Sequence, residues 1–235
     1  MKSKCIMVAG IACGGTSCVA GILHNAGVDM GKSAQVEGAT YYDDWISYPE
    51  NPKAQYEDAS AVKISWRILG GAWYYPRVPL VLSGQLADDL TNYVELRCIE
   101  EPLWGIKAPS FAFTGPFFLE AMKCYADPRL VIVYRNEYII AKHITKRFAV
   151  DGIRPLGALV HVGDASRALW RLAARATALG IPCYAIHYET IVAEPETVVP
   201  NFLEALFTGW SERTPEQIQK AIDFVDPSLN HAESQ

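Results

Sequence analysis

A short apolar run, a cluster of glycines and an amphipathic helix follow one another near the start of the chain, and this succession constrains the fold most. Cys5–Ala9 (CIMVA) predicts a buried strand, glycines at 10, 14 and 15 interrupt it, and apolar residues recur at helical spacing from Thr16. Backbone N–H groups at such a helix start have no internal partners, and the helix dipole favours negative charge there. Glycines let the backbone close around a phosphate or sulfate. The segment therefore predicts an anion site.

The loop differs from the Walker A pattern GxxxxGK[ST] of proteins that bind nucleoside triphosphates. Gly10 and Gly15 have the required spacing, but Thr16 stands where that pattern has its lysine. Thr16 and Ser17 would add hydroxyl donors to the loop. An ordinary glycine-rich turn of an α/β protein has the same appearance, so this segment alone leaves a ligand site and a plain turn both open.

Length and composition indicate a single domain spanning residues 1–235. The net charge of −5 argues against general nucleic-acid binding. No apolar run is long enough to cross a membrane, and the start MKSKCIMVAG reads as a first strand and not as a signal peptide. The six cysteines include no CxxC pair; most are expected to be reduced core residues, with Cys13 in the glycine loop as the exception, and a cytoplasmic protein is favoured.

Apolar periodicity and glycine or proline breaks predict the remaining elements. Further strands are expected at 104–110, 129–134 and 182–188, and helices at 56–69, 86–99, 116–125, 137–148, 164–179, 194–207 and 215–224. Asp164 is the expected N-cap of its helix and Gly180 its stop. This alternation predicts a three-layer α/β fold, with a mainly parallel central sheet flanked by helices, of the P-loop nucleotide-binding type.

Residues 31–51 predict a long loop with little periodicity. Tyr41, Tyr42 and Trp45 in this loop would either line an acceptor pocket or anchor the loop to the core. Two basic residues stand at strand ends, where ligands gather in open α/β sheets: Lys107 before Pro109, and Arg135 after the β-branched run RLVIVY. A solvated lysine and a strand-end salt bridge are the plainer alternatives for these two.

Four segments, in order and spacing, resemble the bacterial and phage-type sulfotransferases that use 3′-phosphoadenosine 5′-phosphosulfate (PAPS). GIACGGTSCVAGILHNAGVDMG is similar to the loop and first helix of that family, and WGIKAPS to its tryptophan–lysine–proline strand. RLVIVYRNEYIIAKHITKRF is similar to the strand and helix that hold the 3′-phosphate. PCYAIHYETIVAEPETVVPNFLEALF, followed by DFVDPSL, is similar to the family's tyrosine–glutamate–acidic segment. Together they span nearly the whole chain.

The resemblance implies transfer of a sulfuryl group from PAPS to a hydroxyl of a small molecule or glycan, with release of 3′-phosphoadenosine 5′-phosphate (PAP). Residues 13–17 (Cys13, Gly14, Gly15, Thr16, Ser17) would cradle the 5′-phosphosulfate, and Arg135 would hold the 3′-phosphate through bidentate bonds. His143 stands where the family has an assisting serine, although a half-buried helix residue is an equal interpretation. No metal is expected, because lysine or arginine can supply the charge.

The loop departs from the family pattern, because Cys13 replaces a basic residue and Gly14 replaces a serine. Lys107 is then the best candidate to stabilise the leaving phosphate or the transferring group. Glu57 is the candidate base for the acceptor, or else a helix N-terminal acid favoured by the dipole. A sulfotransferase-fold protein that binds PAP or another anion without efficient turnover is the second hypothesis. A P-loop nucleotide kinase is the third, disfavoured by Thr16.

Overall fold

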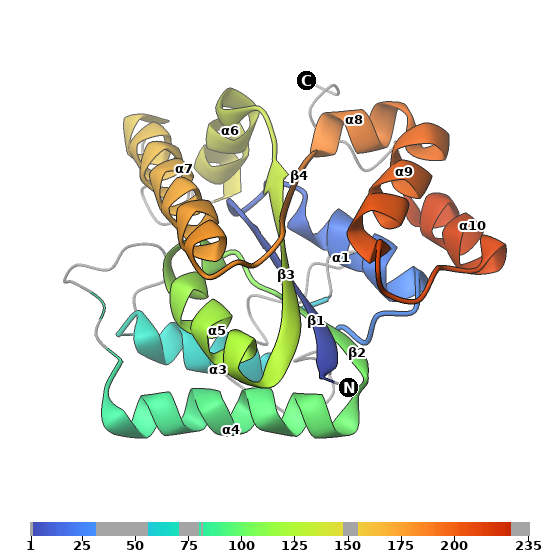
Figure 1. The fold of residues 1–235 in the computed structure, drawn as a ribbon. Coiled ribbons are helices and arrows are strands. Elements are labelled where there is room, and N and C mark those ends of the chain that lie inside the picture. The colour runs from blue at the N-terminus through green and yellow to red at the C-terminus, as the bar shows by residue number, and fades with distance from the viewer. Residues whose placement is uncertain (1, 32–55, 71–79, 81, 148–154, 227–235) are drawn as a thin grey trace.

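A computed structural model describes residues 2–31, 56–70, 80, 82–147 and 155–226 of the chain. Within them, four parallel strands form one sheet in the order β2-β1-β3-β4 (Figure 1). The strands are β1 (Ser3–Gly10), β2 (Leu103–Lys107), β3 (Ala126–Tyr134) and β4 (Cys183–His187). Parallel neighbours need crossover connections, and helices supply them here.

The central strand β1 is buried on both faces, as its continuous apolar run predicts. Cys5 and Met7 face one hydrophobic core, Ile6 and Val8 face the other, and all four are fully buried. In the register, Val8 lies opposite Lys107 of β2 on one side and Val131 of β3 on the other. The ends of three strands and the glycine loop therefore meet at one edge of the sheet.

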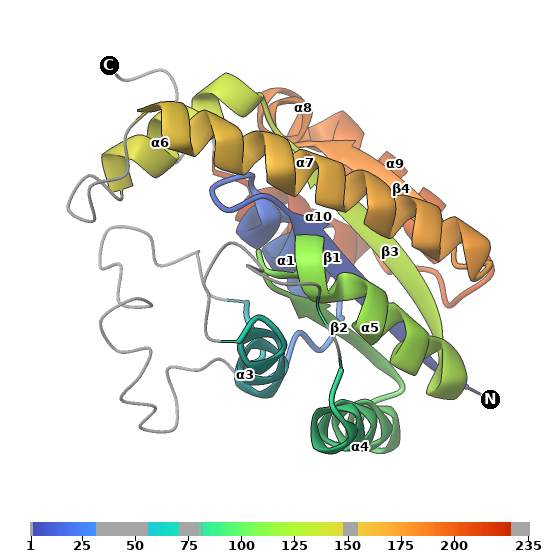
Figure 2. The same cartoon turned by 90° about the vertical axis from the view of Figure 1, so that its left-hand side faces the viewer.

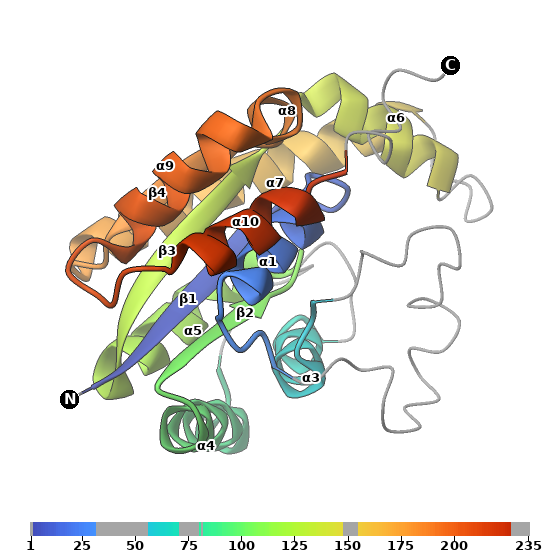
Figure 3. The ribbon, with the colours of Figure 1, turned by 90° about the vertical axis from the view of Figure 1, so that its right-hand side faces the viewer.

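Helices cover both faces, which confirms the α/β fold with a parallel sheet flanked by helices. The first face carries five helices from the middle of the chain (Figure 2): α3 (Ala59–Ile68), α4 (Gly84–Glu100), α5 (Phe111–Tyr125), α6 (Glu137–Arg147) and α7 (Pro155–Ala178). The opposite face carries the first helix and the C-terminal ones (Figure 3): α1 (Thr16–Asn25), the short α8 (Tyr188–Ala193), α9 (Pro195–Phe207) and α10 (Pro215–Phe224).

Most expected elements are present, but several begin or end at other residues than expected. Strands β2 and β3, for example, are Leu103–Lys107 and Ala126–Tyr134, where 104–110 and 129–134 were predicted. Helix α7 starts at Pro155, so Asp164 lies inside it and pairs with Arg167, and its prediction as an N-cap is wrong. Helix α5 starts before Pro116, since its buried first turn holds the helix in place. The last strand ends at His187, because Tyr188 already begins α8.

Three further expectations concern the loop at 31–51, the cysteines and membrane-spanning segments. The loop at 31–51, with Tyr41, Tyr42 and Trp45, falls outside them apart from its first residue. All six cysteines are free thiols, but Cys124 and Cys183 are exposed, so their expected core positions are wrong. In the part of the chain that the structure describes, no helix combines the length and apolar character needed to cross a membrane.

A single residue after α1 extends the sheet beyond β2. Asp29 forms an isolated bridge with Trp104: its N–H donates to the Leu103 carbonyl (3.2 Å), and its carbonyl accepts from the Gly105 N–H (2.8 Å). Arg97 of α4 donates to the Asp29 carboxylate (2.5 Å) and carbonyl (3.0 Å). Burial alone would raise the pKa of Asp29, but hydrogen bonds from Arg97 and the next glycine lower that pKa overall. The buried guanidinium of Arg97 thus holds the segment around Asp29 beside β2.

Replacing Arg97 with methionine should lower the free energy of unfolding by about 1–3 kcal/mol, because bonds from a buried charged donor are lost. The pKa of Asp29 lies below its ordinary value in the folded state. Its contribution is therefore complete above the unfolded pKa of about 3.9 and is lost as pH falls through the folded value. Urea unfolding at several pH values should show the difference between wild type and Arg97→Met shrinking below that point.

The control is Arg67→Met, which breaks an ion pair with Asp89 at the surface. Exposed pairs contribute roughly 0–1 kcal/mol, so this variant should stay close to wild type at every pH. Equal losses for the two variants would contradict the role assigned to the Arg97–Asp29 pair.

Candidate functional site

The glycine loop between β1 and α1 has an unusual backbone. Cys13 has φ 64° and Gly15 has φ 88°, and the Gly14 N–H donates to the Ile11 carbonyl (2.8 Å). A Cβ on Gly15 would lie 2.3 Å from Cδ2 of Tyr188. Glycine is thus required there both by the left-handed backbone and by the ring above it. The loop is closed tightly over the helix start.

Lys107 reaches this helix start from the end of β2. Its side chain is 1% exposed, and its Nζ donates to the Ser17 Oγ (3.1 Å) and to Glu57 Oε1 (2.6 Å). A buried ammonium is stable only when it is paired and hydrogen-bonded, and this geometry satisfies that requirement. The structure therefore brings together Lys107, Ser17 and Glu57, which the sequence had placed in one site.

Arg135 reaches the same loop from the end of β3. Its guanidinium donates to the Cys13 carbonyl (2.9 Å), and its Cζ lies 4.6 Å from the centroid of the Tyr188 ring. Cation–π contacts of this kind favour a fixed guanidinium orientation. The two cations thus approach the loop from the two strands that flank β1.

A cavity of about 620 Å³ opens beside Arg135, at the carboxyl ends of β3 and β4. The start of α6, two residues of α7 (Ser166 and Leu169) and, around the start of α8, His187, Glu189 and Thr190 also line it. Two carboxylates also line it, and each has a donor: Glu189 accepts from the Asn136 N–H (2.9 Å), and Glu137 accepts from the Ser166 hydroxyl. The cavity is large enough for a small organic ligand.

The structure also defines the surroundings of two other predicted binding residues, His143 and Thr16. His143 is half-buried on α6 and is not among the residues that line the cavity beside Arg135. Thr16 is 5% exposed, and its Cγ2 would lie 2.5 Å from a Cβ on Gly10, so its methyl packs against the end of β1. Among the described residues, no three His, Cys, Asp or Glu side chains form a group that could hold a metal.

Tyr188 and Glu189 are site residues that the sequence reasoning did not single out. Tyr188 covers Gly15 and Arg135, and Glu189 fixes the backbone that follows Arg135. Burial and the nearby Cys18 raise the pKa of Tyr188, partly offset by Arg135. Their signal was the tyrosine–glutamate pair of the fourth segment, where strand β4 gives way to α8.

Comparison with known proteins agrees with this geometry at the level of the fold. No family model matches the chain, and no curated protein matches its sequence. Among solved structures, the sulfotransferase domain from the curacin biosynthetic pathway has a TM-score of 0.53 at 14% identity, covering 93% of this chain and 77% of that one. Sulfotransferase STF1 from Mycobacterium tuberculosis H37Rv has a TM-score of 0.51 at 16% identity, covering 95% and 71%. The chain has a sulfotransferase fold.

Replacing Gly15 with alanine should destabilise the protein more than the same change at a free turn. The left-handed backbone costs an alanine about 1–2 kcal/mol, and the forced displacement of the Tyr188 ring adds about 1–3 kcal/mol. The matched control is Gly180→Ala, because Gly180 has φ 65° with nothing within 4 Å of a Cβ. Urea unfolding should show the larger loss for Gly15→Ala, and equal losses would contradict the packing of Tyr188 on the loop.

Proposed function

We propose that this chain is a sulfotransferase that moves a sulfuryl group from PAPS to a hydroxyl of a small molecule or glycan. The observation that carries the proposal is the delivery of Lys107 and Arg135, from the strands on either side of β1, to one glycine loop. PAPS has a 5′-phosphosulfate and a separate 3′-phosphate, so it needs cationic positions at two neighbouring strand ends. The sulfotransferase fold supports the same assignment.

In this proposal, the loop and Arg135 bind the two anionic groups of PAPS. Residues 13–17 would bind the 5′-phosphosulfate through the backbone N–H groups of the helix start, next to the Tyr188 ring that packs against Gly15. Arg135 would turn its guanidinium to the 3′-phosphate and the adjoining cavity would take the remainder of the nucleoside. His143 stays a prediction for the 3′-phosphate, because it lies outside that cavity lining.

Lys107 and Glu57 supply the chemistry in the proposal. The acceptor oxygen forms a bond to sulfur while the bond from sulfur to the phosphate oxygen breaks, and the hydroxyl proton passes to the Glu57 carboxylate. Lys107 stabilises the negative charge that develops on the leaving phosphate. Lys107 Nζ lies 2.6 Å from Glu57 Oε1, so this one contact fixes the relative positions of the base and the charge-stabilising group.

A second candidate function is binding of PAP or a related anion without efficient transfer. Cys13 supports this candidate, because it stands where the family has a basic residue, and its carbonyl already accepts a bond from Arg135. A nucleotide kinase is less well supported, because Thr16 occupies the Walker lysine position and packs against β1.

Calorimetry with PAP, ADP and ATP tests the proposed nucleotide preference, and Arg135→Ala tests whether Arg135 binds PAP. PAP should bind in preference to the others, and Arg135→Ala should weaken PAP binding by about 1.5–3 kcal/mol, because a charge-assisted bond is lost. The control is Arg175→Ala, which breaks a surface pair with Glu120 and should leave PAP affinity unchanged. Unchanged affinity in Arg135→Ala would remove this residue from the site, and ATP binding that requires Mg²⁺ would overturn the proposal.

Replacing Cys13 with arginine separates transfer from binding alone. The variant restores a cation beside the loop, so PAPS turnover should rise by about 10–100-fold if loop charge limits catalysis, measured as PAP release. A low wild-type rate that the variant raises supports an impaired but present enzyme. Turnover that appears only in Cys13→Arg would favour the binding function for the natural chain.

A further inference from the structure

We propose that Tyr56 and Asp58 are positioning residues, which hold Glu57 from both sides so that its carboxylate meets Lys107. The proposal rests on the function proposed above and adds residues to that site. The observation behind it is that both neighbours of Glu57 are anchored to different elements of the fold, while Glu57 itself spans the gap to β2.

Asp58 anchors the C-terminal side of Glu57 as the N-cap of α3. Its Oδ1 accepts hydrogen bonds from the N–H groups of Ser60 and Ala61, both at 3.0 Å, and the residue is 6% exposed. Its other carboxylate oxygen lies 2.1 Å from where a Cβ of Gly31 would stand, and Gly31 has φ 83°. Asp58 is therefore fixed both to the helix that follows and to the segment beside β2.

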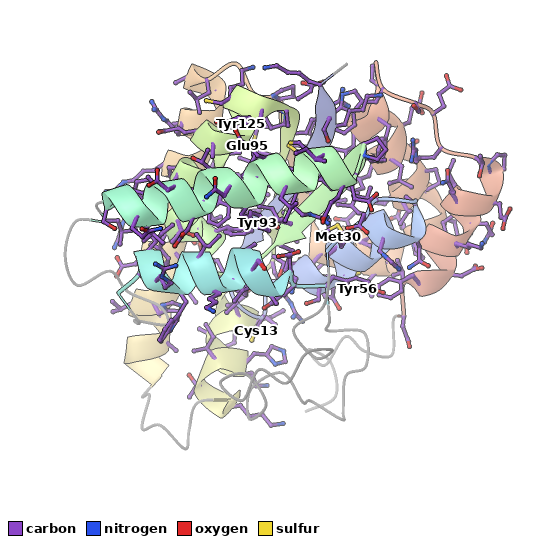
Figure 4. The ribbon with its side chains drawn as sticks, turned by 90° about the horizontal axis from the view of Figure 1, so that it is seen from below. Cys13, Met30, Tyr56, Tyr93, Glu95 and Tyr125 are labelled. Atoms are coloured by element: carbon purple, nitrogen blue, oxygen red, sulfur yellow. The ribbon has the colours of Figure 1, made fainter. Side chains whose placement is uncertain are left out.

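That segment is itself fixed by the buried guanidinium of Arg97. The Gly31 N–H donates to Asp29 Oδ1 (2.9 Å), the same carboxylate oxygen that accepts from Arg97 (2.5 Å). Tyr93 lies between α4 and α3 (Figure 4). Its buried ring packs edge-on against Trp104, with 6.5 Å between the ring centroids. Burial and the neighbouring Asp58 carboxylate raise the pKa of Tyr93. These contacts therefore fix the position of Glu57 relative to β2, the strand that carries Lys107.

Tyr56 anchors the N-terminal side of Glu57 to two other helices. Its ring lies 5.2 Å from the ring of His24 on α1 and 5.7 Å, edge-on, from that of Phe224 on α10. Helix α1 also carries Ser17, the second partner of Lys107. The two anchors therefore relate Glu57 to both elements that present the ammonium.

Fixed geometry at this point has a direct chemical consequence. The Glu57 side chain is 25% exposed, so an unanchored carboxylate would be drawn toward water and away from Lys107. Displacements near 1 Å at a reacting group cost on the order of 100-fold in rate. Asp58 would then influence catalysis without touching a substrate, through the place it gives to Glu57.

A double-mutant cycle between Asp58 and Glu57 tests the proposal. Asp58→Ala should lower kcat for PAPS turnover about tenfold or more, yet change kcat less than about twofold when Glu57→Gln is already present, because coupled residues are not additive. Asp58→Asn keeps a capping oxygen and should recover most of the rate. Tyr56→Phe keeps the ring contacts and should resemble wild type, whereas Tyr56→Ala should resemble Asp58→Ala.

The matched control is Thr214→Ala, which removes the side-chain cap of α10 at the end of that helix opposite Phe224. It loses the same kind of hydrogen bond and should leave kcat within about twofold of wild type. The proposal is overturned if Asp58→Ala and Thr214→Ala lower kcat equally, or if the effect of Asp58→Ala persists in the Glu57→Gln background.

A wild-type protein without PAPS turnover would contradict the proposed transfer, and PAP affinity then provides a separate readout of positioning. Because Glu57 and a bound anion share Lys107, Asp58→Ala should change the PAP dissociation constant about threefold or more in the wild-type background and not with Glu57→Gln. Equal changes in both backgrounds would overturn the positioning role, whatever the outcome for turnover.

Discussion

The pairing of β1 with a parallel strand on each side is the constraint on which the rest of the site depends. Parallel strands deliver their carboxyl ends to the same edge of a sheet, so residues far apart in sequence arrive together there. Lys107 ends one neighbour, and Arg135 follows the other. Both faces of β1 are buried, and the helices that bury them also fix the loop that follows it.

Acceptors of the protein already engage both cations of the site. Lys107 gives its ammonium to Glu57 and Ser17, and Arg135 gives a donor to the Cys13 carbonyl. A binding anion must therefore compete with acceptors that are already in place, which lowers the net gain from each cation. Affinity in such a site depends on how well the ligand matches both cations at once, so a ligand with two separate anionic groups has an advantage over a single sulfate or phosphate ion.

Local sequence patterns predicted most helices and strands, and they placed Lys107 and Arg135 at strand ends, where the structure has them. The helices at 194–207 and 215–224 needed little correction, because proline at their starts and apolar periodicity agree with the packing. Asp164 was misassigned because a capping residue was inferred locally, whereas α7 begins at Pro155 and buries Ala158 and Val162 before it reaches Asp164. Tyr188 over Gly15, and Arg97 on Asp29, are contacts between distant segments, and no spacing along the chain reveals them.

The isolated bridge at Asp29 also matters for the outer boundary of the sheet. An open strand edge offers unpaired N–H and C=O groups to any other extended chain, and natural proteins block such edges. Asp29 engages the backbone of β2 on both sides of Trp104, and a carboxylate–guanidinium pair lies directly on it. The same contact that orders the approach to Glu57 therefore also occupies the Leu103 carbonyl and the Gly105 N–H, two groups of β2 that edge-to-edge association would need.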